Sequence, residues 1–167
     1  GGKARELAFM NTMLAKYSYY YKSPNVRMLI PRSLVIASDC FEEFIQLNGL
    51  DYIISQDIPD DIVLEEFLNS VMPESVYEKL KVFVKTCTKP LAVRSSSKLE
   101  DSHYQPFAGV YSTYMGPRCE DDDQMLRLLA RAIKSVYAST YFASSKAYVQ
   151  STQNVLSEEL MAVLIHE

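Results

Sequence analysis

Two patterns are missing from this 167-residue sequence, and each absence excludes a class of protein. No apolar run is long enough to cross a membrane, and no signal-peptide pattern is present. A strong excess of one charge is also missing, because 17 Lys and Arg stand against 21 Asp and Glu, for a net charge of −4. The sequence therefore gives no support to general nucleic-acid or membrane-surface binding, and any anion site must be local.

Cysteine and histidine are scarce. Cys40, Cys87 and Cys119 are odd in number and have no CxxC spacing, which predicts free thiols in a reducing, cytoplasmic compartment instead of a disulfide or a metal site. His103 lies in a polar loop, where solvation is the ordinary interpretation, and His166 lies in an apolar run typical of a core histidine. No HExxH motif, Ser-His-Asp order or paired Cys/His set is present, so the residues alone indicate neither nucleophilic nor metal-hydrolytic catalysis.

What remains is the composition of an ordinary globular protein, with 48% apolar and 23% charged residues. A chain of this length can bury roughly 70% of its unfolded surface. No internal repeat, low-complexity tract or linker divides it, so we predict one mixed α/β (α+β) unit over residues 1–167. The chain opens at Gly1 without Met and stops at Glu167 inside a strand-like run, and we expect it to be a piece of a longer protein.

Apolar spacing and turn residues predict the elements of this unit. Residues 50–58 are ambiguous. Helices are expected over 3–16, after Ser38 or Asp39 as the cap, and from Asp60. Another is expected from Pro73, which is allowed in a first turn. A last helical stretch is expected from the acidic run 121–123 to about 150, with a break near 139–140. Strands are expected over 33–37, 91–93, 110–114 and 160–165.

Arg94 is the first candidate functional residue, because it follows an apolar strand and precedes three serines. One interpretation is structural, an ion pair with Glu100 or Asp101. The other is an anion site, since a planar and permanently charged guanidinium holds two phosphate oxygens at once. Hydroxyl and backbone N–H groups of Ser95 and Ser96 would then supply further donors from a turn.

A second candidate is Gly2-Lys3 at the head of a helix. Glycine permits close backbone approach, a helix start favours anions, and lysine adds a mobile charge. The GxxxxGK[ST] pattern of a Walker loop is absent, so this signal is weak by itself. Tyrosines at positions 17 and 19–21 favour packing at a helix exit over stacking on a base.

Three pieces of the sequence resemble one family. They are Gly1-Gly2-Lys3, then Val93-Arg94-Ser95-Ser96-Ser97 followed by Glu100-Asp101, then Phe107-Ala108-Gly109 with Thr113. Together they are similar to the nucleotide-binding domain of phosphoenolpyruvate synthase and pyruvate phosphate dikinase, which begins with a GGK helix and carries VRSSAxxEDxxxxSFAGxxxTxL. Rifampicin phosphotransferases share this domain. The spacings from arginine to glycine and from glycine to threonine are those of the family, and residues 130–139 resemble the segment that follows the motif.

The resemblance implies an ATP-grasp fold, of which this chain is the first lobe. It implies that Lys3 and Arg94 hold the phosphates of ATP and act in the transfer, and that Gly109 and Thr113 line the same phosphate loop. ATP would phosphorylate a histidine on a separate swivelling domain, which carries the phosphoryl group to a pyruvate site. The Mg²⁺ ligands, the second lobe, and the phosphohistidine and pyruvate domains are expected beyond residue 167, so this chain alone is not expected to complete a turnover.

The sequence departs from the family pattern in two places. Lys98-Leu99 precedes Glu100, and the run 102–106 follows Asp101, so the substrate-facing loop is expected to differ. His166 stands where the family often has a glutamine near the adenine hinge, and it offers one donor or acceptor there. Two alternatives stay open: a non-catalytic nucleotide-sensing or interaction module that kept the fold, and a phosphotransferase with another acceptor, such as an antibiotic.

Overall fold

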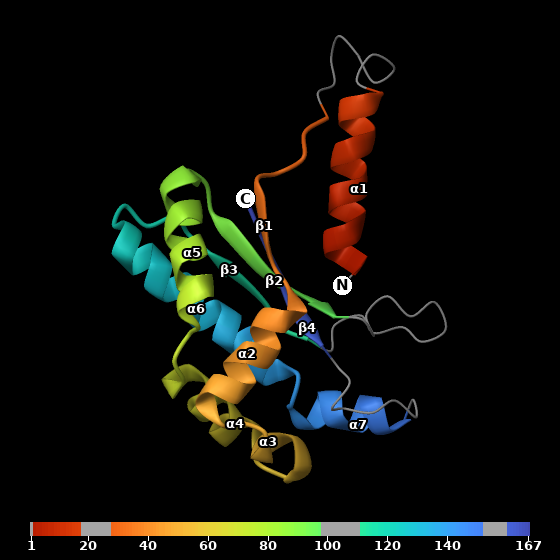
Figure 1. The fold of residues 1–167 in the computed structure, drawn as a ribbon, viewed down its shortest axis with the longest axis vertical. Coiled ribbons are helices and arrows are strands. Elements are labelled where there is room, and N and C mark those ends of the chain that lie inside the picture. Colours follow the sequence, from red (N-terminus) through yellow and green to blue (C-terminus); the bar gives the residue numbers. More distant parts are fainter. Residues whose placement is uncertain (1, 18–27, 98–110, 152–159) are drawn as a thin grey trace.

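The computed structural model describes residues 2–17, 28–97, 111–151 and 160–167. Helices pack against a four-stranded sheet, so the predicted mixed α/β fold class is confirmed (Figure 1). Within these ranges no helix is long and apolar enough to span a membrane. The helices are α1 (Gly2–Lys16), α2 (Ser38–Asn48), α3 (Tyr52–Ser55), α4 (Asp60–Asn69), α5 (Glu74–Thr86), α6 (Asp122–Ser139) and α7 (Ala143–Ser151). The strands are β1 (Ser33–Ile36), β2 (Leu91–Ser97), β3 (Thr113–Gly116) and β4 (Met161–His166).

The sheet is antiparallel throughout and has the strand order β1-β4-β2-β3. The last strand in the chain, β4, therefore lies between β1 and β2. Directly paired residues share a face of the sheet, and successive residues of a strand alternate between its faces. The register of pairing thus assigns each strand residue to one of two faces.

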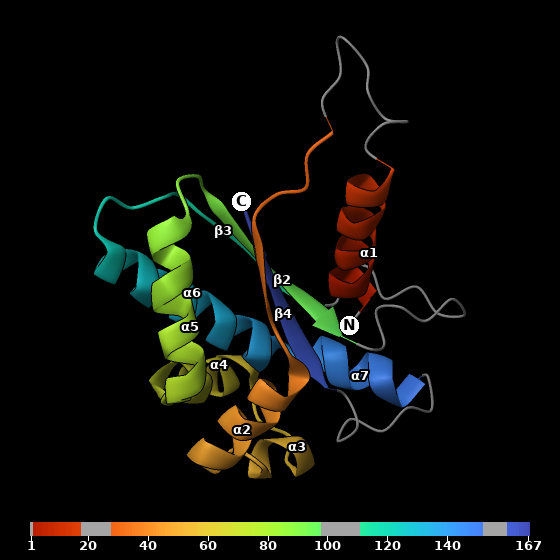
Figure 2. The ribbon, with the colours of Figure 1, turned by 45° about the horizontal axis from the view of Figure 1, so that its top comes forward.

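One face of the sheet carries the hydrophobic core. Leu91 and Val93 of β2, with Val163 and Ile165 of β4, are almost fully buried on it. Helices α2 and α6 contact the sheet, and α4 and α5 pack on α6. The helix α1 stands on the other side, apart from these helices, as two views of the ribbon show (Figures 1 and 2).

All of the predicted helices are present. The apolar residues of the helical period are buried in the core helices, whereas in α1 the buried residue is Gly2. In α5, for example, all four predicted apolar residues are buried, namely Val76, Leu80, Phe83 and Val84. The predicted break in the long C-terminal helix is confirmed, because α6 ends at Ser139 and α7 begins at Ala143. Asp121 caps α6 by accepting a hydrogen bond from the Asp123 amide at 2.9 Å, inside the acidic run expected to start this helix.

Two predicted caps are wrong. The N-cap of α2 is Ala37, without a side-chain hydrogen bond, and both Ser38 and Asp39 lie inside the helix. The Asp39 carboxylate instead accepts from the next amide, Cys40 N, at 2.9 Å. Pro73 is the N-cap of α5 and not its first helical residue. Both errors shift a boundary by about one residue and leave the buried face of each helix unchanged.

The strands around Arg94 differ from the prediction. β2 does not stop at Val93 but continues through Arg94 and the three serines to Ser97, because β4 pairs with it along that length. β3 begins at Thr113 and not at residue 110, and it ends at Gly116 as expected. Arg94 is therefore the central residue of a strand, and the serines are not a turn.

The three cysteines are free thiols, as the sequence predicts. Cys87 is buried, and Cys40 and Cys119 are partly buried. Burial raises the pKa of the Cys87 thiol, and the nearby Glu167 carboxylate raises it further. Burial also raises the pKa of Cys40, with a smaller contribution from Asp39. Both thiols are thus held in the protonated, less reactive form.

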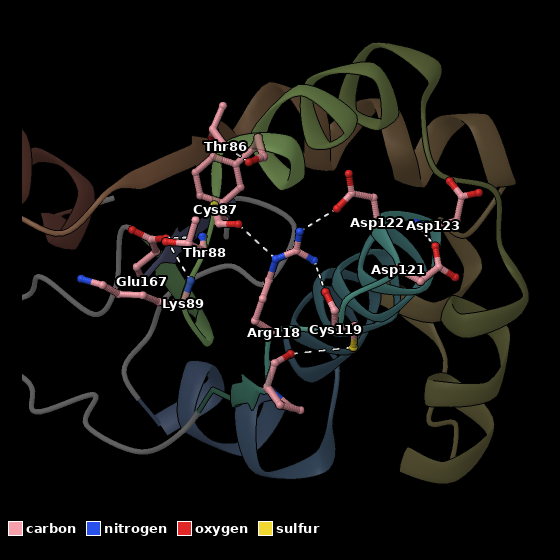
Figure 3. A network of polar contacts seen from close by, with 12 residues as sticks. Thr86, Cys87, Thr88, Lys89, Arg118, Cys119, Asp121, Asp122, Asp123 and Glu167 are labelled. Atoms are coloured by element: carbon pink, nitrogen blue, oxygen red, sulfur yellow. Dashed lines mark hydrogen bonds and ion pairs between the residues drawn. The ribbon is translucent and has the colours of Figure 1, made fainter.

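Arg118 joins the end of α5 to the start of α6 at the edge of the sheet (Figure 3). Its Nε donates to the Cys87 carbonyl at 3.0 Å, and Nη1 donates to the Cys119 carbonyl. Its Nη2 lies 2.6 Å from Asp122 Oδ1, in the first turn of α6. One guanidinium therefore ties the end of α5 to the start of α6, which fixes the helical layer behind the sheet.

We expect Arg118→Gln to lower the free energy of unfolding by about 1–3 kcal/mol, because the amide leaves two backbone carbonyls and a carboxylate without their donor. Urea denaturation followed by circular dichroism measures this loss. Arg127→Gln is the matched control, since Arg127 is 68% exposed and reaches Asp121 only at 3.9 Å. Equal stability of the two variants would contradict a joining role for Arg118.

Candidate functional site

Arg94 lies on the sheet face turned away from the core. In the register, it is opposite Thr113 of β3 on one side and Leu164 of β4 on the other. Its neighbours on that face of β2 are Ala92 and Ser96, which point the same way. Arg94 and Thr113 are both exposed although they belong to a sheet whose centre is buried. A rigid strand therefore presents a guanidinium beside a hydroxyl at an open surface.

Lys3 reaches the same place from α1. Its ammonium donates to the carbonyl of Ser95 at 3.1 Å, the residue directly after Arg94. The amide of Ala4 donates to Ser96 Oγ at 3.4 Å. These two contacts seat the amino end of α1 on β2, the strand with which this helix makes several contacts. The first helix thus brings a second cation, and the positive end of its dipole, to the face that carries Arg94.

The two serines have different positions. Ser95 is buried, and alternation along β2 places its side chain on the core face, while its carbonyl accepts the hydrogen bond from Lys3. Ser96 is on the face of Arg94, but it is fully buried and its hydroxyl accepts from the α1 backbone. The turn from which both were expected to donate is replaced by a strand. Their observed contacts position Lys3 and the start of α1.

His166 is the last residue of β4 and lies on the same face as Arg94. It pairs with Ala92 of β2 and with Ser33 of β1, so it is a diagonal neighbour of Arg94 across the ladder. Diagonal neighbours in an antiparallel sheet are roughly 7–8 Å apart, within reach of long side chains. Its ring is half-buried, and Nδ1 lies 3.2 Å from the Glu167 carbonyl. Gly109, Glu100 and Asp101 lie outside the described residues.

A groove of about 670 Å³ runs between α1 and β1 on this face. Ser33 of β1 is the register partner of His166, so the groove begins beside the histidine. Its residues come from α1 (Ala4, Leu7, Ala8, Asn11), from residues 29–33 and Val35, and from Lys89 and Glu167. Sequence reasoning did not select these residues, because Arg32 and Lys89 come from connections, Glu167 follows the last strand, and none of the three carries a motif.

Glu167 ties the rim of this groove together (Figure 3). Its Oε1 accepts from the amide of Thr88 at 2.8 Å and from the amide of Lys89 at 3.3 Å. These backbone hydrogen bonds lower the pKa of the Glu167 carboxyl, and the charges of Arg32 and Lys89 lower it further. The carboxylate is therefore held in its charged form where the end of β4 meets the loop before β2.

Comparison with known proteins identifies the family of this chain. All residues from 1 to 167 match the family described as pyruvate phosphate dikinase, AMP/ATP-binding domain. The chain belongs to this family. It is thus an ATP-binding domain of the phosphoenolpyruvate synthase and pyruvate phosphate dikinase group, as its three sequence pieces indicate.

Two curated relatives of this dikinase-family domain are distant in sequence. One is an uncharacterized phosphotransferase, YvkC, of Bacillus subtilis, with 27% identity over 138 residues, which cover 81% of this chain and 15% of the relative. The other is a phosphoenolpyruvate synthase of Aeropyrum pernix, with 23% identity over 159 residues, which cover 83% of this chain and 19% of the relative. The chain therefore spans less than a fifth of either relative.

Proposed function

We propose that residues 1–167 form the first lobe of an ATP-grasp unit in a longer phosphotransferase, and that Arg94 and Lys3 hold the phosphates of ATP. The observation that supports this most directly is the shared face: Arg94 and Thr113 are direct neighbours there, and Lys3 reaches the residue after Arg94. Two cations and a hydroxyl at an open surface match the charge and the hydrogen-bonding capacity of a triphosphate.

The groove between α1 and β1 extends this proposal to the rest of the nucleotide. It lies on the face of Arg94, begins beside His166, and has apolar side chains such as Leu7 and Val35 on its walls. We assign the adenosine part of ATP to this groove, with His166 supplying one ring nitrogen as donor or acceptor. Its volume of about 670 Å³ falls within the range of small-molecule sites, about 300–1,000 Å³.

In the parent protein, ATP bound in this way would pass a phosphoryl group to a histidine of a swivelling domain and then to pyruvate. The contribution of this lobe would be positioning and charge neutralisation, which is most of the catalysis in phosphoryl transfer. Among the described residues no group of three or more His, Cys, Asp or Glu side chains is placed to hold a metal ion. We therefore assign the Mg²⁺ ligands to other parts of the parent. The relative named only as a phosphotransferase leaves the acceptor open.

Lys3→Gln tests the role of α1. We expect it to weaken binding of ATP·Mg²⁺ to the parent protein by about tenfold, because one charged contact to phosphate is lost while the helix keeps its amide contact to Ser96. Isothermal titration calorimetry gives the affinity. The matched control is Lys16→Gln, the same charge change in the last turn of the same helix. Identical ATP affinities for the two variants would show that Lys3 does not contact the nucleotide.

A further inference from the structure

A second groove, of about 530 Å³, is lined by residues of the helical layer. This layer lies on the side of the sheet away from α1 (Figure 1). It runs along α6. Its other sides are formed by the end of α4, the loop after α4 and the start of α5. We call it the α6 groove. Its lining residues are Leu68, Val71, Met72, Glu74, Tyr77, Arg127, Ala130, Arg131 and Lys134.

Three cations line the α6 groove from one helix. Arg127, Arg131 and Lys134 are four and three residues apart, the spacing that places side chains on one face of a helix. From the first to the last the helix rises by roughly 10 Å, so the three charges form a row along the groove. The chain as a whole has a net charge of −4, which makes a row of three cations a local exception.

These cations have few carboxylate partners in the described part of the chain. Arg131 forms no ion pair there, and Arg127 lies 3.9 Å from Asp121, with both side chains mostly exposed. Lys134 is half-buried and donates to the Leu68 carbonyl at 3.1 Å, near the end of α4. Burial lowers the pKa of Lys134, and no carboxylate offsets that effect. The described residues around the row therefore neutralise it only in part.

The other charged and titratable residues at the groove belong to α5. Glu74 and Tyr77 line it, and Lys81 lies 5.0 Å from the centre of the Tyr77 ring and pairs with Glu78. Glu74 forms no ion pair with the row within the described ranges. It is in the first turn of α5, a helix whose N-cap has no side-chain hydrogen bond. The positive end of the α5 dipole therefore adds to the field of the three cations, and Glu74 offsets part of it.

We propose that the α6 groove binds a small organic phosphate, with the phosphate held by Arg127 and Arg131 and the organic part lying on the wall of Leu68, Val71 and Tyr77. An arginine fork matches phosphate oxygens in two-point contacts, and two forks one helical turn apart can share one phosphate. The wall is available to a ligand, because Val71 is 65% exposed. The groove volume of about 530 Å³ falls within the range of small-molecule sites, about 300–1,000 Å³. This site is separate from the proposed ATP face, which lies across the sheet.

The experiment titrates the protein that carries this chain with phenyl phosphate and with inorganic phosphate, at constant ionic strength, by isothermal titration calorimetry. Phenyl phosphate is expected to bind several-fold more tightly, because its ring can cover the apolar wall. The double variant Arg127→Gln/Arg131→Gln is expected to weaken phenyl phosphate binding by at least about tenfold. Lys79→Gln/Lys85→Gln is the charge-matched control, since both lysines are exposed on α5 and neither lines the groove. Circular dichroism verifies that both double variants are folded.

Four results would overturn the proposal. Wild-type protein that binds neither probe has no such site. An equal loss in both double variants would mean that only net charge matters. If Arg94→Gln weakens phenyl phosphate binding and the double variant of the α6 groove does not, the phosphate lies at the proposed ATP face instead. Equal affinity for phenyl phosphate and inorganic phosphate would show that the apolar wall does not contribute to binding.

Discussion

Arg94→Gln is expected to weaken ATP binding to the parent protein by ten- to a hundredfold and to lower phosphoryl transfer at least as much. A two-point contact between guanidinium and phosphate contributes about 1.5–3 kcal/mol, which corresponds to this range of affinity. The loss is expected to be large because the strand holds Arg94 in place, with Thr113 directly opposite. Calorimetry with ATP·Mg²⁺ and a phosphoryl-transfer assay measure the two effects.

The variants around this position distinguish charge from shape. Arg94→Lys keeps the charge but loses the planar fork of the guanidinium. Its ATP affinity should therefore lie between those of the wild type and Arg94→Gln. Lys85→Gln is the control, because it removes an exposed cation of α5, in the helical layer across the sheet, that lines neither groove, and it should leave ATP affinity unchanged. Stability should change little in either case, since Arg94 is exposed. Wild-type ATP affinity in Arg94→Gln would refute the proposed phosphate contact.

The helical layer could be predicted from the sequence because its signal is local. Apolar residues of α5 and α6 repeat with the helical period and are the residues buried in the core. Caps were less predictable, since Ala37 and Pro73 begin helices without a side-chain hydrogen bond. The surrounding fold holds the backbone at these two helix starts, and no residue type in the local sequence indicates this.

The strand through the serines was missed for a different reason. Ser95, Ser96 and Ser97 have neither the branched nor the aromatic side chains that favour strands, so they are typical of a loop. They are extended because β4, far away in the sequence, pairs with them one by one. Partners that distant are set by the tertiary fold, and the position of β4 between β1 and β2 could not be predicted either.

Some residues of the candidate site could be predicted from the sequence and others could not, and the difference has a physical explanation. Lys3, Arg94 and Thr113 belong to a spaced motif, and the structure brings Arg94 next to Thr113 and Lys3 next to Ser95. Arg32 and Lys89 belong to connections whose position depends on the packing of α1 and on the end of β4. Nothing in their local sequence separates them from other exposed cations.

The second large effect is expected in the core, at Phe44. This ring is fully buried and lies 5.7 Å from the ring of Phe67 and 5.3 Å from that of Tyr137, measured between centroids. Phe41 and Tyr141 extend the same cluster, which joins α2 to α4 and α6. Phe44→Ala should lower the free energy of unfolding by about 3–5 kcal/mol, because the cavity can close only partly. Phe9→Ala, at a position 64% exposed, should change it by less than about 0.5 kcal/mol.

Tyr137 shows whether ring packing or polarity dominates in this cluster. Its hydroxyl is buried without a hydrogen-bond partner in the described structure, and burial raises the pKa of this phenol far above its usual value. Tyr137→Phe removes the unsatisfied hydroxyl and keeps the ring, so it should be neutral or stabilising. Phe44→Ala is therefore expected to lower the free energy of unfolding, whereas Tyr137→Phe is not. Chemical denaturation measures both changes. Loss of stability in Tyr137→Phe comparable to that in Phe44→Ala would mean that the hydroxyl has a partner, and that the cluster is not held by apolar packing alone.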